Sequence, residues 1–234
     1  MAVDERAAGA QPAPEQPVQP ERQRGRRLGL SAAFFSAATG LSRVAGLVRE
    51  IVAASYFGVT GAMSAFTIAF QVPNLVRALF ADAALQGAFV PVFTELLEKG
   101  KKKEAFAVAS GLFSLIAMVL GSITILFWLL APVIMPAVSP GFSPHLQDLT
   151  VHLSQLMFPI VLLLALAGIV VGMLNSFEHF SVPALSPVIW NLVIIASLVG
   201  LTPLFHGDDR VYAYAIGVLV GTVIQFLLPL PWLR

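Results

Sequence analysis

Long apolar stretches without a charged side chain dominate the second half of the chain. No Asp, Glu, Lys or Arg occurs in residues 105–147, 149–177, 179–207 or 211–233. A helix that crosses a bilayer needs roughly 20 consecutive apolar residues, and each of these intervals can hold one. The pattern therefore predicts membrane-spanning helices.

Two earlier apolar stretches, each interrupted by arginine, extend the pattern to six predicted spans. Gly, Pro, Asn and charged residues separate the spans, as is typical of turns. We therefore expect an all-α, polytopic membrane protein, in which the longer spans tilt or kink. The predicted spans are 28–57, 61–97, 104–135, 148–176, 182–201 and 211–233.

Composition agrees with this fold class. The mean hydropathy is +0.84, and only 12% of residues are charged, against about 25% in soluble domains. Residues 1–27 differ, being rich in Pro, Gln, Ala and Arg, and we expect them to form a disordered basic tail ahead of a bundle over 28–234. The net charge of +1 gives no reason to expect a nucleic-acid partner.

The basic residues predict the orientation of the bundle. With the amino terminus in the cytoplasm, ten of the 14 lysines and arginines lie on the cytoplasmic side, and Arg210 alone lies outside. This distribution follows the positive-inside rule, so both ends of the chain are expected to be cytoplasmic. The ten are Arg6, Arg22, Arg24, Arg26, Arg27, Lys99, Lys101, Lys102, Lys103 and Arg234.

The remaining three arginines lie within the predicted spans. Arg43 and Arg77 are each about 15 residues, or roughly 22 Å, from the start of their span. An arginine at such depth costs at least ~2.5–3.5 kcal/mol on insertion scales, so it normally faces a partner or an aqueous cavity. A guanidinium suits phosphate because its planar fork donates two parallel hydrogen bonds. The arginines are therefore candidates for an anion site.

Arg49 lies nearer the outer end of the first span, where two interpretations stay open. It can pair with Glu50 or extend toward the outer surface, or it can face the same cavity as the deeper arginines. Gly46 would let the first span bend or approach a neighbour closely.

The second span offers further candidates around Arg77. Pro73 is expected to kink this span beside Arg77, and Asn74 adds a polar group there. Asp82 is either a counter-ion or a residue at the cytoplasmic end of the span.

Several chemistries lack their motifs. The chain has no phosphate-binding G-x-x-x-x-G-K-[ST] run, so we expect no direct use of ATP. It has no cysteine, no metal-ligand spacing of histidines and no clustered acidic motif for Mg²⁺-dependent prenyl-phosphate chemistry. We therefore expect no metal, no cofactor and no catalysis.

Several longer strings are specific enough to indicate a family. The segments LSRVAGLVREIVAASYFG, AFTIAFQVPNLVRALFADAALQGAFVPVF, APVIMPAVSPGF and VGMLNSFEHFSVPALSPVIWN resemble the amino-terminal half of the MurJ (MviN) lipid II flippases. These proteins belong to the multidrug/oligosaccharidyl-lipid/polysaccharide exporter superfamily and have about 14 helices in two lobes. The resemblance implies that this chain forms the first lobe, in the bacterial cytoplasmic membrane.

The same resemblance implies a substrate and its ligands. The substrate would be the undecaprenyl-diphosphate-linked peptidoglycan precursor, moved to the outer leaflet by alternating access, and Arg43, Arg49 and Arg77 match arginines important in the family. One position departs from the pattern: Ser64 stands where many members have an aspartate. The family's salt bridge across the outer gate is therefore not expected here.

Two alternative functions stay open. The chain could belong to an exporter of another polyprenyl-linked oligosaccharide, or to a membrane scaffold that binds anionic lipid without transporting it. An exporter of cationic drugs fits less well, because the residues predicted to face the cavity are predominantly basic.

Overall fold

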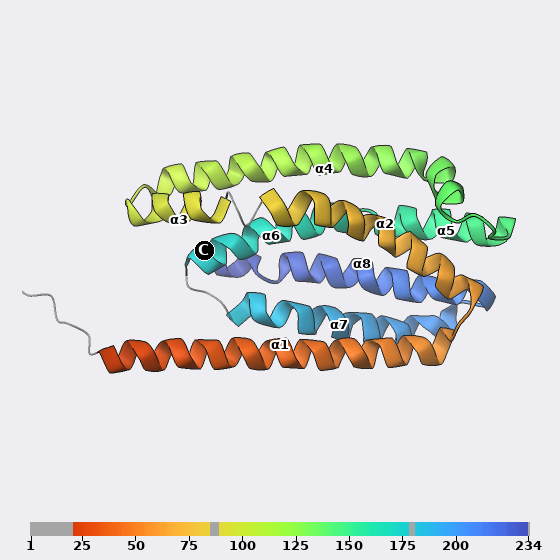
Figure 1. Cartoon of the computed structure of the whole chain (residues 1–234), viewed down its shortest axis with the longest axis horizontal. Helices are drawn as coiled ribbons and strands as arrows, with labels where there is room; N and C mark the ends of the chain where they lie inside the picture. Colours follow the sequence, from red (N-terminus) through yellow and green to blue (C-terminus); the bar gives the residue numbers. More distant parts are fainter. Residues whose placement is uncertain (1–20, 85–88, 178–180, 234) are drawn as a thin grey trace, which may run out of the picture.

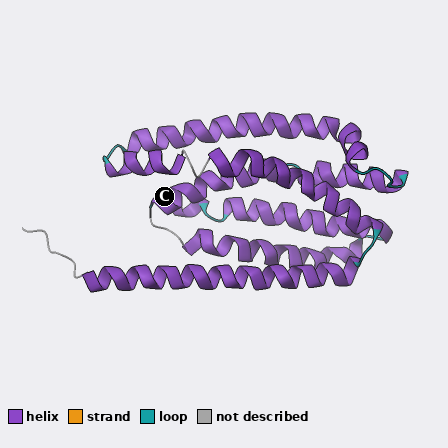
Figure 2. Cartoon of the chain, in the orientation of Figure 1, coloured by secondary structure: helices purple, strands orange, loops and turns teal. Residues whose placement is uncertain are grey.

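The computed structural model describes residues 21–84, 89–177 and 181–233, with side chains for 34–76, 89–177 and 181–233. Every element in these ranges is helical (Figure 2). Residues 1–20 of the predicted disordered tail lie outside the described residues, as does Arg234. Residues 21–27, which were also predicted to belong to the tail, are helical and form the start of the first helix.

The main helices lie roughly side by side along the long axis of the molecule (Figure 1). In chain order they are α1 (Glu21–Phe57), α2 (Gly61–Ala84), α3 (Val90–Glu98), α4 (Lys102–Val138), α5 (Pro144–Met157), α6 (Ile160–Ser176), α7 (Ser181–Leu201) and α8 (Val211–Leu227), with short 3₁₀ turns η2 (Thr202–Leu204), η3 (Gly207–Arg210) and η4 (Leu230–Leu233).

Four helical stretches in the described part are long and apolar enough to cross a membrane. They are Lys102–Val138, Pro144–Ser176, Ser181–Leu204 and Gly207–Leu233. The arginine-bearing helices α1 and α2 are not among them, so the count of six spans stays a prediction. The all-helical membrane architecture itself is confirmed.

Two predicted spans consist of two helices each. The stretch 61–97 contains α2 and α3, with residues 85–88 outside the described part; Pro91 lies in the first turn of α3, where a proline suits a helix start. The stretch 148–176 turns at Phe158 and Pro159, between α5 and α6. Pro159 has no N–H to donate, which favours the break.

The two proposed bend points behave differently. The helix α1 continues through Gly46 over 37 residues, and it is nearly straight in Figure 1. The helix α2 contains Pro73 and changes direction along its length (Figure 1). The expected kink is therefore seen in α2 and not at Gly46, where helical hydrogen bonding is not interrupted by a proline.

Apolar side chains form two packed clusters. One joins α3, α4 and α6 around Phe93, Phe158 and Ile169, and the other joins α1, α2, α5, α7 and α8 around Ala65, Met157 and Ile194. Many large side chains of α4, such as Met118 and Val133, are exposed. A membrane protein presents such a face to lipid, which costs nothing in hydrocarbon.

One polar bond joins α4 to α5 across this apolar packing. The Gln155 side-chain N–H donates to the main-chain carbonyl of Trp128 at 2.8 Å. That carbonyl would normally accept from the N–H of residue 132, which is proline and cannot donate. The rings of Phe127 and Phe158 stack alongside, with centroids 3.7 Å apart. Gln155 thus satisfies a carbonyl that the α4 proline frees.

We expect Gln155→Leu to lower the melting temperature of the purified chain in detergent. The change leaves the Trp128 carbonyl without its donor in an apolar setting, a loss of about 1–2 kcal/mol. Gln147→Leu, the same replacement near the start of α5, is the matched control. Equal melting temperatures for the two variants would show that the bond does not stabilise the bundle.

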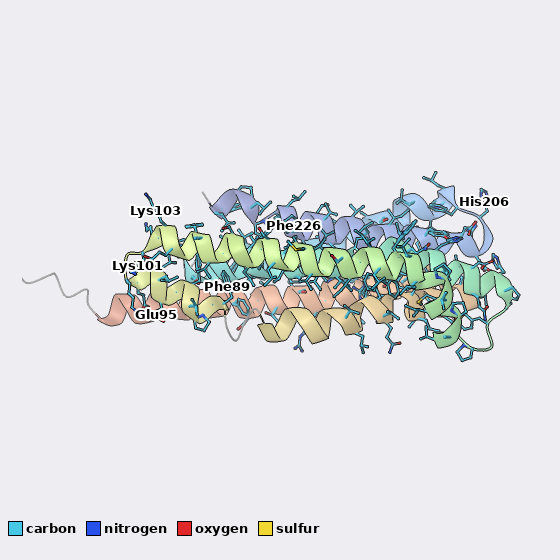
Figure 3. The ribbon with its side chains drawn as sticks, turned by 90° about the horizontal axis from the view of Figure 1, so that it is seen from above. Phe89, Glu95, Lys101, Lys103, His206 and Phe226 are labelled. Carbon is cyan, nitrogen blue, oxygen red and sulfur yellow. The ribbon has the colours of Figure 1, made fainter. Side chains whose placement is uncertain are left out.

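The two ends of the bundle differ in charge. Lys101, just before α4, and Lys103, in its first turn, lie at one end, and His206 lies at the other (Figure 3). The start of α1 and the turn η4 lie at the lysine end (Figure 1). The ends that the positive-inside rule assigns to the cytoplasm are therefore on one side of the molecule.

Candidate anion-binding cavity

A cavity of about 320 Å³ opens between α1, α2, α7 and α8. Its polar wall comes from α1 and α2, and its aromatic wall comes from α2, α7 and α8. The polar residues are Arg49, Glu50, Thr67, Gln71 and Asn74, and the aromatic residues are Phe66, Phe70, Trp190 and Tyr214. A cationic side chain therefore borders a cavity inside an otherwise apolar bundle.

Arg49 is held in this cavity by three neighbours. Its Nη1 donates to the Oδ1 of Asn191 at 3.1 Å, and its Nη2 pairs with the Glu50 carboxylate. Its Cζ lies 5.1 Å from the centre of the Trp190 ring, within the range of a cation–π interaction. The side chain is 18% exposed, so its charge is largely shielded from solvent.

The guanidinium keeps donor capacity for a ligand. Its two terminal nitrogens together carry four N–H groups, more than Asn191 and Glu50 take up. The Nε is buried and has no hydrogen-bond partner among the described residues, so the polar anchoring comes from the terminal nitrogens. An anion in the cavity can therefore bind Arg49 through the outer N–H groups, in competition with Glu50.

Trp190 is fixed from the opposite side by α8. Its indole N–H donates to the Thr222 hydroxyl at 3.1 Å, and Thr222 in turn donates to the Val218 carbonyl. Gly221 lets the ring approach closely, since a Cβ there would lie 3.0 Å from Trp190. Helix α8 thus sets the ring against which Arg49 rests.

The aromatic wall is preorganised by stacking. The Phe66 and Tyr214 rings are 4.2 Å apart and nearly parallel, and Phe66 also stacks on Phe70 at 6.0 Å. Stacked pairs of this kind restrict side-chain motion and add stability beyond burial. The cavity therefore has one rigid apolar wall facing a polar one.

Of the residues predicted from sequence, Arg49, Glu50 and Asn74 line this cavity. The two interpretations of Arg49 are both seen in the structure, because it pairs with Glu50 and also lines the cavity. Arg43 is exposed and does not line the cavity, because on α1 it lies six positions, or about 120°, from Arg49.

The other predicted residues contribute less to the described geometry. Ser64 is exposed, and Pro73 is buried within α2. The side chains of Arg77 and Asp82 lie outside the described residues. No group of three or more metal-ligating side chains occurs within the described part of the chain.

Sequence reasoning missed Trp190, Asn191 and Tyr214. The available signal was the polar Asn191 in the middle of an apolar stretch, preceded by an amphipathic aromatic residue. Only the packing of α7 and α8 in the bundle brings these residues to Arg49, which is more than 140 positions away.

Comparison with known proteins places this arrangement in a family. The family described as "Lipid II flippase MurJ" matches residues 53–234. The chain belongs to the MurJ family. It is 36% identical over 198 residues to the lipid II flippase MurJ of Burkholderia cenocepacia, covering 84% of this chain and 38% of that protein.

Further MurJ relatives match a similar share of this chain. A probable lipid II flippase MurJ of Treponema pallidum is 36% identical over 209 residues, covering 86% of this chain and 38% of its own length. A solved structure of lipid II flippase MurJ in an inward closed conformation matches with a TM-score of 0.69 at 28% identity, covering 84% of this chain and 41% of that one. The chain thus spans about two fifths of the length of the MurJ proteins that it matches.

Proposed function

We propose that this chain is the arginine-bearing lobe of a flippase that moves undecaprenyl-diphosphate-linked peptidoglycan precursor from the cytoplasmic to the outer leaflet of the bacterial cytoplasmic membrane. The observation that carries the proposal is the Arg49 guanidinium at the wall of a cavity between helices in a chain of the MurJ family. The protein would act as a transporter and not as an enzyme.

The cavity suits the charged part of such a lipid. A diphosphate offers oxygen acceptors in the spacing that a guanidinium fork recognises, and Glu50 neutralises Arg49 while no substrate is bound. Arg43 and Arg77 would contact the diphosphate or line its path as the lobes move. Alternating access requires a second bundle that rocks against this one.

A complementation assay tests the proposal. The full-length protein is expected to restore growth to a strain depleted of its own lipid II flippase, and to expose labelled lipid II at the outer face of the membrane. Restored transport of another polyprenyl-linked oligosaccharide, without lipid II, would favour the related exporter instead. Binding of anionic lipid with no translocation would favour the scaffold.

The proposed orientation places Lys103 in the cytoplasm and His206 outside. In intact cells a membrane-impermeant maleimide is expected to label His206→Cys and not Lys103→Cys. The chain has no native cysteine, so the background is clean, and permeabilised cells provide the control in which both label. Labelling of Lys103→Cys alone in intact cells would reverse the orientation.

A further inference from the structure

Asn191 carries a buried primary amide in the middle of α7. Its exposed fraction is 5%, and the stretch Ser181–Leu204 around it is apolar enough to cross a membrane. A buried amide without partners is costly in such surroundings. The contacts of Asn191 therefore show what it holds together.

Every polar atom of the Asn191 side chain is used. Its Oδ1 accepts the hydrogen bond from Arg49, and its Nδ2 donates to the Pro187 carbonyl at 2.9 Å and to the Ser42 carbonyl at 3.5 Å. Two of these three bonds reach α1, at residues about two turns apart along that helix. The amide therefore fixes both the contact between α7 and α1 and the position of the arginine.

The two ends of the Asn191 amide have opposite hydrogen-bonding roles. The amide oxygen accepts from the Arg49 cation, and the amide nitrogen donates to two carbonyl oxygens. If the amide were turned by 180°, its nitrogen would face the cation and its oxygen would face the carbonyls, so only one orientation satisfies these partners. A carboxylate would place an oxygen against those carbonyls and add a negative charge beside the cavity. Leucine would match the size of asparagine but leave both ends of the network without a partner.

Gly46 lies beside this amide on α1. A Cβ at residue 46 would lie 3.8 Å from the Asn191 Oδ1 and 3.9 Å from its Nδ2, which is ordinary contact distance. The amide therefore packs directly on the α1 surface, between Ser42 and Arg49. A neighbouring helix beside Gly46 was one of the two alternatives predicted for this position, but the contact does not require glycine, because a Cβ would fit there.

We propose that Asn191 is a positioning residue that directs the Arg49 guanidinium into the cavity for an anionic diphosphate. This inference rests on the proposed function, because it requires Arg49 to bind the substrate anion. Asn191 acts through Arg49: it holds one terminal nitrogen, the Trp190 ring lies against the guanidinium, and Arg49 lines the cavity. It contacts the cation and not the substrate.

The test compares diphosphate with neutral lipid. The full chain in lipid nanodiscs is titrated with undecaprenyl diphosphate and with undecaprenol, and Asn191→Ala is compared with Arg49→Ala and with the double variant. We expect Asn191→Ala to weaken diphosphate binding about tenfold, the loss of one hydrogen bond to a charged group. Undecaprenol binding should stay within about twofold.

Ser186→Ala is the matched control. Ser186 is also a buried polar residue of α7, but its hydroxyl bonds the Val182 carbonyl on its own helix. This variant should bind both lipids as the unchanged chain does. In the Arg49→Ala background, adding Asn191→Ala should cause no further loss of diphosphate affinity.

The outcomes separate the inference from the function on which it rests. If Arg49→Ala weakens diphosphate binding but Asn191→Ala does not, the positioning role is wrong and the proposed function stands. Losses that add in the double variant, or that affect undecaprenol equally, show a structural role and overturn the inference. If Arg49→Ala has no effect on diphosphate binding, both the Arg49 site and the positioning role fail.

Discussion

Replacement of Arg49 by alanine in the full-length protein is expected to abolish rescue of a flippase-depleted strain. The change removes the cation that lines the cavity, together with its bonds to Asn191 and Glu50. Hydrogen bonds to a charged group contribute about 1.5–3 kcal/mol, which corresponds to roughly 10- to 150-fold weaker binding of the diphosphate. The loss should be seen both in growth and in translocation of labelled lipid II.

The Arg49→Lys variant separates shape from charge. Lysine keeps the charge but presents a compact ammonium in place of a planar fork, so it cannot reach Asn191 and Glu50 and still offer two parallel donors. We expect partial rescue. Full rescue by lysine would show that the cavity requires only a positive charge, and full rescue by alanine at normal membrane abundance would remove Arg49 from the site.

Arg43→Ala and Arg77→Ala are expected to abolish rescue as well. The assignment of these two residues to the anion site depends on their depth in the predicted spans and on family resemblance, because the structure describes no contact of either residue in the cavity. Retained growth in both variants would confine the anion site to Arg49 and its neighbours.

Gly217→Leu is expected to separate α7 from α8 and give a chain that fails to reach its native fold. A Cβ at residue 217 would lie 2.8 Å from the Cβ of Ser197 and 3.2 Å from the main-chain Cα of Ile194. Neither contact can be relieved by rotating a side chain, because Cα and Cβ atoms move only with the main chain, so the helices must move apart. Overpacking of this kind costs about 3 kcal/mol or more.

The loss should be seen as a melting temperature well below that of the unchanged chain in detergent. Gly111→Leu is the matched control, because a Cβ at residue 111 on α4 meets nothing within 4 Å. Separation of α7 from α8 would also break the Ser197 hydroxyl bond to the Ala213 carbonyl and displace Trp190. Equal stability of the two leucine variants would show that the close approach is not needed.

The helices were predictable to the extent that hydropathy alone defines them. The uncharged intervals after Glu104 correspond to α4, α5 with α6, α7 and α8. The break between α5 and α6 at Pro159 could not be predicted with the same ease, because one proline in an apolar stretch can either kink a helix or end it. Here Gln155 supports the break by bonding across to α4, and that contact depends on tertiary packing.

The site was predictable only on the side that carries charge. Arg49 was identifiable because a guanidinium in an apolar stretch needs a partner, and Glu50 is adjacent in sequence. Asn191 and Trp190 could not be assigned to it, since a polar residue in a span has many possible neighbours. Arg43 was selected with Arg77 for its depth, but it lies about 120° around a straight α1 from Arg49, and only Arg49 of these two lines the cavity.

The ion pair between Arg49 and Glu50 has an electrical consequence. In the proposed transport cycle both charges would move with α1 and cancel, so this ion pair would carry no net charge across the membrane potential as the empty lobe moved. A bound diphosphate adds its own negative charge to the moving unit. In the proposed cycle, the movement with bound diphosphate and the movement without it would therefore respond differently to the membrane voltage. The difference is about 2.3 kcal/mol for each elementary charge carried through 100 mV.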